Sequence, residues 1–436
     1  MDCLESTDTS STASIQCFKL LVKMATMIPT NHFIVAFACI FTATLYYVLE
    51  FHLCEVLFQG GSLVTLTYNP ESHVYRNVVS KCSILHGRYC ATPWLSSPHL
   101  QTMLLEFVAK PPEFSYKREI FLSSDGGTFA LDWLMSSDVL HSENENDILW
   151  NKGTTPTVLV IPGLTSDSTA AYIRHLVHTT AIRGWNAVVC NHRGMAGVPF
   201  TSDRAYNSGW TTDVRDVIDH LHHKYPEVPL FAVGTSIGAN ILVKYLGEYG
   251  ETVPLAGAAA ICSPWDLLIG SRYIARTLIQ NLYGIILTMG LKSYAKSNQT
   301  HFTRLADWEG IMKSRHMPEF DKAVTCAMEN FETADAFYRW CSSAAYTRDV
   351  AVPLLSISSL DDPVCTVEAI PWHECRANKN IVFATTKHGG HLGFFEGIRA
   401  PSLWWVRAVN EFLSVLHSTS MQRHNKVIVM SRSNTR

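Results

Sequence analysis

From Thr157 onward, short apolar segments alternate with longer stretches in which apolar residues recur at helical spacing. Each apolar segment has five to seven residues, which is typical of strands buried on both faces of a sheet. Strands that alternate with helices are joined by right-handed crossovers, so the pattern predicts an α/β protein with one mostly parallel central sheet. The predicted strands are Thr157–Ile161, Asn186–Cys190, Pro229–Val233, Leu255–Ile261, Pro353–Ser359 and Ile381–Thr386.

Two further segments, Lys117–Leu122 and Thr128–Leu134, precede this alternation and flank the turn sequence Asp125-Gly126-Gly127. This arrangement predicts a β-hairpin. The polar and acidic stretch Ser136–Gly153 then separates the hairpin from the first predicted parallel strand, and we expect it to be a surface loop.

Between residues 263 and 350 the strand pattern disappears and helical spacing takes its place. Leu282–Leu291 is largely apolar. We expect a helical cap inserted before the strand at 353–359, whose side chains form an apolar pocket and exclude water. The bulky aromatic residues of this region are Trp308, Phe320, Phe331, Phe337, Tyr338 and Trp340.

The N-terminal region contains one nearly continuous apolar run, Phe33–Leu49, which ends at Glu50. Its length lies at the short end of what spans a bilayer. We therefore predict a tail at 1–32 followed by a transmembrane anchor at 33–51. The chain would then be a single-pass membrane protein, of the endoplasmic reticulum or another endomembrane.

The charges around this run indicate its orientation. Lys19 and Lys23 precede the run, whereas Glu50 and Glu55 follow it closely. The positive-inside rule then favours a cytosolic N-terminus, with the rest of the chain on the far side of the membrane.

The remainder of the chain divides by composition into three parts. Residues 52–115 are expected to form a juxtamembrane segment, and residues 116–416 the main α/β domain. Residues 417–436 are polar and basic, so we expect a disordered tail there.

Composition narrows the class of protein. Apolar residues make up 47% of the 436 residues and charged residues 17%, which suits a globular protein with some membrane-directed surface. The formal net charge is −3, and no basic block indicates nucleic-acid binding. The 12 cysteines form no Cys-x-x-Cys pair and no cluster with histidines at metal-ligand spacing. We expect no metal, no cofactor and no nucleic-acid partner, and the oligomeric state is left open.

The sequence Gly234-Thr235-Ser236-Ile237-Gly238 lies between the predicted strand at 229–233 and the helix-like stretch Ala239–Tyr249. A strand that turns sharply into a helix presses two chain segments together, and the flanking glycines leave room for this. The serine hydroxyl is then exposed above the sheet, close to the helix N-terminus. This context predicts Ser236 as a nucleophile.

A serine hydroxyl is a poor nucleophile near neutral pH and needs a base, usually a histidine oriented by a carboxylate. The strand at 353–359 runs into Asp361 and Asp362, and the strand at 381–386 runs into His388 and His391. An acid and a histidine in consecutive strand-end loops, after the serine, satisfy this requirement. Spacing alone does not choose between the two aspartates or between the two histidines.

Acyl transfer also requires two backbone N–H groups that stabilise the tetrahedral oxyanion. One should belong to Ile237, the residue after the predicted nucleophile. The other should come from the loop after an earlier strand, and Pro162-Gly163-Leu164 follows the predicted strand at 157–161. We therefore expect Leu164 and Ile237 to form the oxyanion hole.

Several further segments resemble those of α/β-hydrolase-domain esterases of the AB hydrolase 4 family, most closely its plant embryogenesis-associated branch. The family also includes animal membrane-anchored phospholipases and yeast medium-chain fatty acid ethyl ester synthases. The resemblance extends over roughly residues 85–415. It rests, besides Gly234–Gly238, on Trp94–Pro98, His99–Thr102, Asp125–Gly127, Asp132-Trp133, Asn191–Gly194, Trp210–Asp213, Asp361–Pro363 and Gly389–Phe394.

The resemblance implies an α/β-hydrolase fold with Ser236 as nucleophile, Asp362 as acid and His391 as base. It also places the oxyanion loop on Gly163-Leu164. Two positions depart from the pattern. Pro162 stands where many relatives of the wider fold have histidine, and His192 stands where small residues are common. Neither departure touches the implied triad.

Together these features predict a membrane-anchored serine hydrolase that cleaves carboxylic esters, with acyl lipids as substrates, by way of an acyl-enzyme. Carboxylesterase, acylglycerol lipase and phospholipase activities all fit this prediction. An alternative is an acyltransferase that passes the same acyl group to an alcohol. A hydrolase fold that serves only as a catalytically silent interaction module is a second alternative.

One further spacing lies outside this scheme. His316 and Asp321 form the pattern His-x-x-x-x-Asp, which some acyltransferases use. Because it falls in the predicted cap, away from the predicted triad, we interpret it as a coincidence.

Overall fold

The computed structural model describes residues 30–47, 60–140, 155–399 and 402–433. The chain divides into two compact units, Met1–Gly60 and Gly61–Arg436. In the first unit, helix α2 (Thr30–Tyr47) carries the apolar run, and its side chains Ile34, Phe37 and Ile40 are exposed. The rest of the predicted tail and anchor, residues 1–29 and 48–51, lies outside the described residues.

Among the described residues, no single helix is both long enough and apolar enough to cross a membrane. Helices α11 (Leu267–Ile274) and α12 (Leu278–Ser297) reach that length and composition only as a pair, and a bend of 116° separates them.

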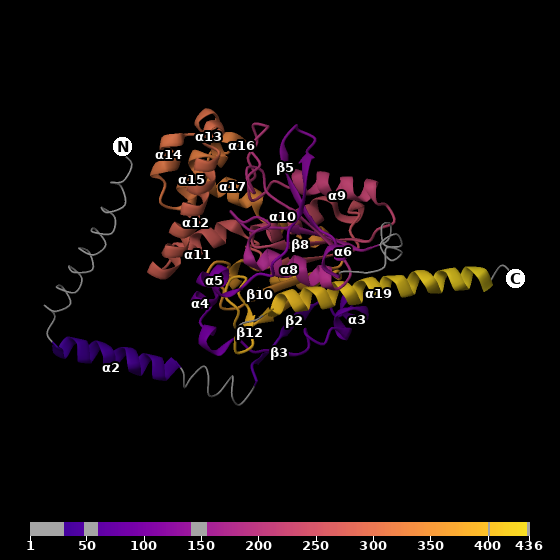
Figure 1. Cartoon of the computed structure of the whole chain (residues 1–436), viewed down its shortest axis with the longest axis horizontal. Helices are drawn as coiled ribbons and strands as arrows, with labels where there is room; N and C mark the ends of the chain where they lie inside the picture. Colours follow the sequence, from indigo (N-terminus) through magenta and orange to yellow (C-terminus); the bar gives the residue numbers. More distant parts are fainter. Residues whose placement is uncertain (1–29, 48–59, 141–154, 400–401, 434–436) are drawn as a thin grey trace, which may run out of the picture. The chain divides into compact units, whose positions relative to one another are not determined.

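The second unit is built around a sheet that has nine strands among the described residues, in the order β2-β11-β10-β9-β8-β6-β7-β5-β4 (Figure 1). The six strands from β11 to β7 are parallel to one another, whereas β2, β5 and β4 pair antiparallel. The strands are β2 (Thr65–Tyr68), β4 (Lys117–Leu122), β5 (Thr128–Leu134), β6 (Thr157–Ile161), β7 (Asn186–Cys190), β8 (Leu230–Thr235), β9 (Gly257–Ile261), β10 (Leu354–Ser359) and β11 (Ile381–Thr386).

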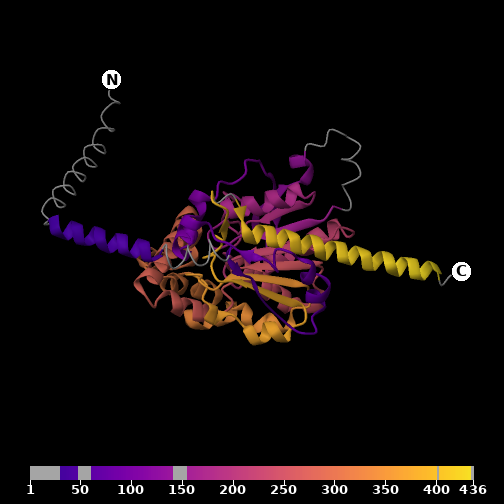
Figure 2. The same cartoon turned by 90° about the horizontal axis from the view of Figure 1, so that it is seen from below.

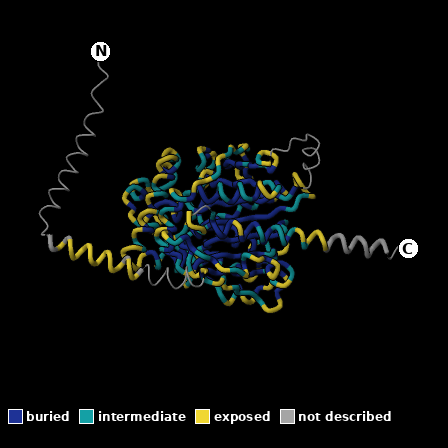
Figure 3. Tube along the Cα trace, turned by 60° about the horizontal axis from the view of Figure 1, so that its bottom comes forward, coloured by how far each residue is buried: buried dark blue, intermediate teal, exposed yellow. Residues whose placement is uncertain are grey.

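The central strands are buried along almost their whole length because both faces of the sheet are covered (Figure 3). In β6, Val158 and Val160 face one core, whereas Leu159 and Ile161 face the other. Helices α8 (Ala171–Ile182) and α19 (Trp404–Ser433) cover the first face (Figure 2). The second face is covered by α9 (Thr212–Lys224), α10 (Ile237–Tyr249) and α18 (Trp372–Ala377).

The predicted hairpin and helical insertion are both present. Strands β4 and β5 pair across Asp125-Gly126-Gly127. Between β9 and β10 the chain forms a run of helices, coloured orange in Figure 1. These are α11, α12, α13 (Gln299–Leu305), α14 (Trp308–Lys313), α15 (Met317–Ala323), α16 (Thr325–Glu329) and α17 (Ala334–Cys341). The predicted fold class, an α/β-hydrolase fold with a helical cap, is confirmed.

The expected boundary at residue 116 needs correction. Residues 61–115 belong to the second unit rather than to a separate juxtamembrane segment, because β2 pairs with β11 and extends the main sheet. Short elements follow in the same segment: β1 (Ser62–Leu63), α3 (His73–Asn77), β3 (Arg88–Tyr89), α4 (Pro98–Met103) and α5 (Leu105–Val108).

The expectation of a disordered tail from residue 417 also needs correction. Helix α19 is anchored by buried residues such as Trp405 and Phe412, and it continues to Ser433. No glycine or proline occurs between residues 404 and 433, so no residue in this stretch stops the helix. Strands β12 (Phe395–Glu396) and β13 (Ser402–Leu403) pair just before this helix.

In the stretch expected to be a surface loop, residues 136–153, the structure has helix α6 (Ser136–Leu140). Residues 141–154 lie outside the described part of the chain.

A substitution of Gly238 tests how tightly α10 is packed against the sheet. A Cβ atom at this position would lie 2.3 Å from the carbonyl oxygens of Ile161 and Pro162. We expect Gly238→Ala to lower the free energy of unfolding by about 3 kcal/mol. The matched control is Gly270→Ala in α11, where a Cβ would meet nothing within 4 Å and helix propensity predicts a gain of about 0.5–1 kcal/mol. Urea unfolding followed by circular dichroism measures both, and equal effects would contradict the packing described here.

Candidate active site

Ser236 occupies the turn between β8 and α10, with φ 51° and ψ −120°. Gly234 and Gly238 make this turn possible, because a Cβ atom on Gly234 would lie 2.4 Å from the carbonyl oxygen of Gly238. The Ser236 amide donates to the Ile261 carbonyl, 2.8 Å away, at the end of β9. The turn therefore holds this serine in a strained conformation at the carboxyl ends of the parallel strands.

The structure brings Ser236, His391 and Asp362 together. His391 Nε2 lies 2.9 Å from Ser236 Oγ, and His391 Nδ1 lies 2.8 Å from Asp362 Oδ2. The Asp362 side chain is fully buried, whereas the His391 side chain keeps 12% of its surface exposed. The hydrogen-bonded order serine, histidine, carboxylate is that of a Ser-His-Asp triad.

Both ends of this arrangement are supported by backbone and loop contacts. Asp362 Oδ1 accepts hydrogen bonds from the amides of Val364 and Cys365, each at 2.8 Å. The His391 amide donates to Thr102 Oγ1 at 2.9 Å. Thr102 belongs to the His99–Thr102 segment in α4, so that segment supports the loop that carries His391.

Asp361 and His388, the two alternatives that spacing left open, pair with each other instead. His388 Nδ1 lies 3.2 Å from Asp361 Oδ2, and the Gly390 amide donates to Asp361 Oδ1 at 3.0 Å. Asp361 therefore supports the backbone of the histidine loop, while Asp362 contacts the imidazole that faces Ser236.

The Gly163-Leu164 loop lies beside Ser236, because a Cβ on Gly163 would lie 3.3 Å from Ser236 Cβ. Two tyrosine hydroxyls hold this loop. The Gly163 amide donates to Tyr172 Oη, and the Thr165 amide donates to Tyr206 Oη, both at 3.1 Å. The amides on either side of Leu164 thus have acceptors within the protein.

His192 and Pro162, the two residues that depart from the family pattern, are in contact with each other. His192 Nε2 donates to the Pro162 carbonyl at 3.0 Å, since a carbonyl can only accept. Its ring stacks on Tyr206 with centroids 4.3 Å apart. Burial lowers the pKa of His192 to about 4, so the ring is neutral at physiological pH. His192 therefore positions the loop that contains Pro162, Gly163 and Leu164, both directly and through Tyr206.

Arg193, the residue after His192, connects three of the segments on which the family resemblance rests: Asp125–Gly127, Asn191–Gly194 and Trp210–Asp213. Its buried guanidinium forms paired hydrogen bonds with Asp213 and with Asp125. A Cβ atom on Gly127 would lie 2.1 Å from Arg193 Nη1, so the hairpin turn needs glycine there. These contacts join the hairpin, the loop after β7 and the start of α9.

Within the described residues, one group near the site has the composition of a metal site. Cys262, Asp362 and His391 each offer a ligand atom, and these atoms lie within 4.8 Å of one another. The carboxylate and the imidazole already bond to each other, and burial holds the pKa of the Cys262 thiol well above its usual value. A neutral thiol is a poor ligand, so this group does not fit a resident metal.

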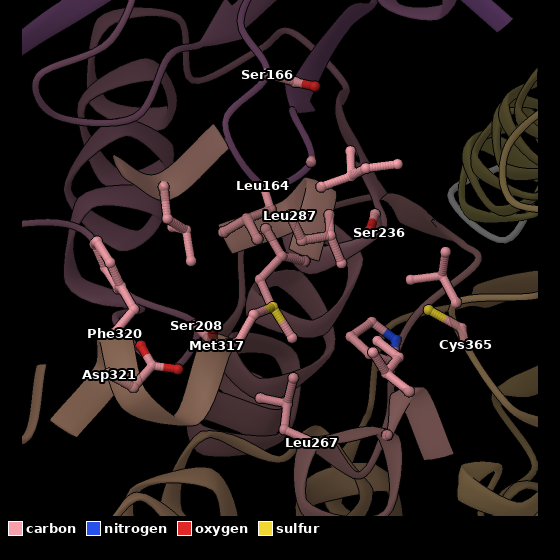
Figure 4. A pocket seen from close by; sticks show the side chains of 18 of the residues that line it. Leu164, Ser166, Ser208, Ser236, Leu267, Leu287, Met317, Phe320, Asp321 and Cys365 are labelled. Carbon is pink, nitrogen blue, oxygen red and sulfur yellow. The ribbon is translucent and has the colours of Figure 1, made fainter. Parts of the chain in front are cut away.

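Ser236 and His391 border a cavity of about 410 Å³ that extends into the cap. This volume lies within the usual range for small-molecule sites. In Figure 4, Leu287 and Met317 of the cavity wall lie near the middle of the view, with Ser236 to one side of them and Phe320 and Asp321 to the other. The apolar residues that line it include Leu164, Ile274, Ile286, Leu287, Leu291, Phe302, Met317, Phe320, Val324 and Phe337.

Sequence reasoning missed three contributors to this region. Tyr172 and Tyr206 reach the Gly163-Leu164 loop from distant elements, and nothing local in the sequence marks them. Asp321 lies in the cap, as expected, and it lines the cavity that Ser236 borders, whereas His316 is not among the lining residues. The sequence carries no signal that singles out Asp321, because other acids such as Glu319 and Glu329 occur in the same cap.

Comparison with known proteins identifies the family. The family model described as serine aminopeptidase, S33 matches residues 153–397. "Phospholipase ABHD3" of Homo sapiens is 33% identical over 337 residues, which cover 77% of this chain and 80% of the relative. "Embryogenesis-associated protein EMB8" of Picea glauca is 32% identical over 357 residues, with coverages of 80% and 77%. "Medium-chain fatty acid ethyl ester synthase/esterase 2" of Saccharomyces cerevisiae is 28% identical over 391 residues, with coverages of 75% and 86%.

The sheet topology and the serine at the strand–helix turn define an α/β hydrolase. The chain belongs to the α/β-hydrolase family described as serine aminopeptidase, S33. This membership and the relatives confirm both the expected family resemblance and the prediction of an ester hydrolase.

The neutral His192 predicts a specific acid sensitivity. Its pKa is about 4 in the folded protein, against 6.5 for an unperturbed histidine, so between these values the unfolded state binds more protons. The free energy of unfolding should therefore fall as the pH drops from 6.5 to 4, with His192 contributing about 3 kcal/mol of the loss. His192→Gln keeps a donor for the Pro162 carbonyl but does not titrate, so it should lose less stability over this range. Urea unfolding at both pH values measures the difference, and identical losses in the two proteins would contradict the assignment.

Proposed function

We propose that this protein is a membrane-anchored serine hydrolase that cleaves carboxylic esters of acyl lipids. The continuous chain of hydrogen bonds from Ser236 through His391 to Asp362, at the border of an apolar cavity, carries the proposal. Ser236 is the nucleophile, His391 the general base and acid, and Asp362 the group that orients the imidazole.

The geometry supports the following sequence of steps. Ser236 Oγ attacks the ester carbonyl while His391 Nε2 takes its proton, and Asp362 stabilises the imidazolium through Nδ1–H. The amides of Leu164 and Ile237 donate to the oxyanion of the tetrahedral intermediate. His391 then protonates the departing alcohol, which leaves an acyl group on Ser236. A water molecule, activated by the same histidine, attacks that acyl group and releases the acid.

The oxyanion role of Leu164 is supported by the contacts of its neighbours. The amides of Gly163 and Thr165 are both engaged by tyrosine hydroxyls, so the loop is held in place on either side of Leu164. A preorganised donor of this kind needs no rearrangement when negative charge develops on the substrate oxygen.

The lining of the cavity supports an acyl chain as the group bound in the cap. Leucine, isoleucine, phenylalanine and methionine side chains dominate its walls, and an apolar chain gains free energy when it leaves water for such a surface. The names of two relatives, a phospholipase and a fatty acid ethyl ester synthase/esterase, agree with this class of substrate.

Membrane anchoring is supported by the apolar surface of two separate helices. In α2, the exposed fractions of Val35, Phe37 and Ile40 are between 61% and 71%. In the second unit, Leu278 and Met289 of α12 are also strongly exposed, and Ile286 of the same helix lines the cavity. Apolar surface of this extent is typical of contact with lipid or with a partner.

Ester synthesis is a second candidate activity, because a relative is named both synthase and esterase. An alcohol that replaces water in the second step would produce an ester from the same acyl-enzyme. Product analysis with increasing alcohol distinguishes the two, since hydrolysis alone at every alcohol concentration would exclude the synthase.

Hydrolysis of p-nitrophenyl esters of graded chain length in detergent micelles tests the proposed substrate class. We expect activity to peak at medium or long acyl chains, because these fill the cavity, and to fall by several orders of magnitude in Ser236→Ala. Equal activity at all chain lengths would contradict the acyl assignment, and undiminished activity in Ser236→Ala would contradict the nucleophile.

The same substitution at the two neighbouring aspartates, Asp361 and Asp362, tests which of them is the acid of the proposed triad. Asp362→Asn should lower kcat by roughly 10⁴-fold, because the amide favours the wrong tautomer of His391. Asp361→Asn should have a much smaller effect, since its partners are His388 and the Gly390 amide. Steady-state kinetics of both variants beside wild type decides the assignment, and the opposite order of effects would identify Asp361 as the acid.

A further inference from the structure

Asp321 places an acidic group in the wall of an otherwise largely apolar cavity. It lies on α15 next to the buried Phe320, and its side chain is seen across the cavity from Ser236 in Figure 4. Glu106 also borders the cavity, but that residue is exposed and accepts from the Ala171 amide. Asp321 therefore differs from the other acid of this cavity.

Within the described part of the chain, the carboxylate of Asp321 accepts hydrogen bonds from two side chains, and both are neutral. Thr325 Oγ1 donates to Asp321 Oδ1 at 3.0 Å, and Tyr338 Oη donates to Asp321 Oδ2 at 2.6 Å. No ion pair among the described residues includes Asp321. A carboxylate offers about four acceptor positions, so two positions are left for water or for a ligand in the cavity.

Asp321 is half-buried, and desolvation raises its pKa to about 6. An apolar chain that reached this carboxylate would remove its remaining water without replacing the hydrogen bonds, and that loss is costly. The far part of a well-bound substrate should therefore carry a hydrogen-bond donor.

We propose that Asp321 is a specificity-determining residue that accepts a hydrogen bond from a hydroxyl group on the acyl chain of the substrate. The inference rests on the proposed function, because it assumes that the acyl chain occupies this cavity. It adds a polar recognition site at a distance from the scissile ester, and it narrows the substrate class to hydroxylated acyl esters.

A hydroxyl group suits this site better than an ammonium group for two reasons. A hydroxyl loses less hydration free energy than an ammonium when it passes the apolar walls of the cavity. A hydroxyl also pairs with either form of the carboxyl group, since it donates to the carboxylate and accepts from the protonated acid. An ammonium pairs only with the ionised form.

The test compares p-nitrophenyl esters of graded chain length, each with and without a terminal hydroxyl group. For wild type we expect one chain length at which the hydroxylated ester has a kcat/KM about fivefold higher than the plain ester. The ratio of the two rates is measured on one enzyme sample, so the fraction of folded protein does not affect it.

Variants of Asp321 and of its hydrogen-bond partner Tyr338 distinguish recognition of the substrate hydroxyl from a role in stabilising the fold. Asp321→Leu should bring the ratio close to one and raise kcat/KM for the plain ester of that length. Tyr338→Phe removes a neighbour of the carboxylate but keeps its charge, so the preference for the hydroxylated ester should persist. A role in the fold alone would lower both rates in each variant and leave the ratio unchanged.

The outcomes distinguish this inference from the proposed function. A ratio near one at every chain length in wild type, or a preference that persists in Asp321→Leu, would overturn the inference while hydrolysis through Ser236 stands. A third series of the same esters with a terminal ammonium group is assayed alongside, and a stronger preference for that series would overturn the hydroxyl assignment. If neither ester is hydrolysed by wild type, or if Ser236→Ala keeps the activity, the proposed function fails, and the inference fails with it.

Discussion

The close approach of α10 to the carboxyl end of β6 is the constraint on which the rest of the site depends. Gly238 leaves no room for a side chain between the helix and the carbonyls of Ile161 and Pro162. Because the helix starts so near the sheet, Ser236 is forced into a turn with positive φ. The same contact brings Gly163, at the start of the loop after β6, beside the serine.

Strained backbone is concentrated around this contact. Ser236 has φ 51° after β8, Thr165 has φ 54° after β6, and Leu392, next to His391, has φ 65°. Such conformations cost of order 1–3 kcal/mol each for residues other than glycine. The surrounding packing holds them in place, since the Thr165 amide is bonded to Tyr206 and the His391 amide to Thr102. Rigid loops are what the proposed acyl transfer needs, because its donors must already point at the developing charge.

The sequence predicted the central strands well because they are buried on both faces and mostly apolar. Three of the six strands begin and end where expected: β6, β7 and β11. The short strand β2 was missed, since Thr65–Tyr68 is only partly buried and carries no clear period. Two adjacent aspartates in one loop cannot be told apart by spacing. Their different partners, His388 for Asp361 and His391 for Asp362, arise only when the loops after β10 and β11 are brought together. The sequence also could not predict that Asp321 lines the cavity, because its position depends on how α15 packs against α17, where Tyr338 donates a hydrogen bond to it.

The central claim is that Ser236 is activated by His391 and attacks acyl groups. Treatment of the full-length protein with a fluorophosphonate probe, followed by mass spectrometry of the labelled peptides, tests it most directly. We expect a single major adduct on Ser236 in wild type and a greatly reduced labelling rate in His391→Ala, with His388→Ala close to wild type. No adduct on Ser236 in folded protein, or an adduct that forms equally fast without His391, would contradict it.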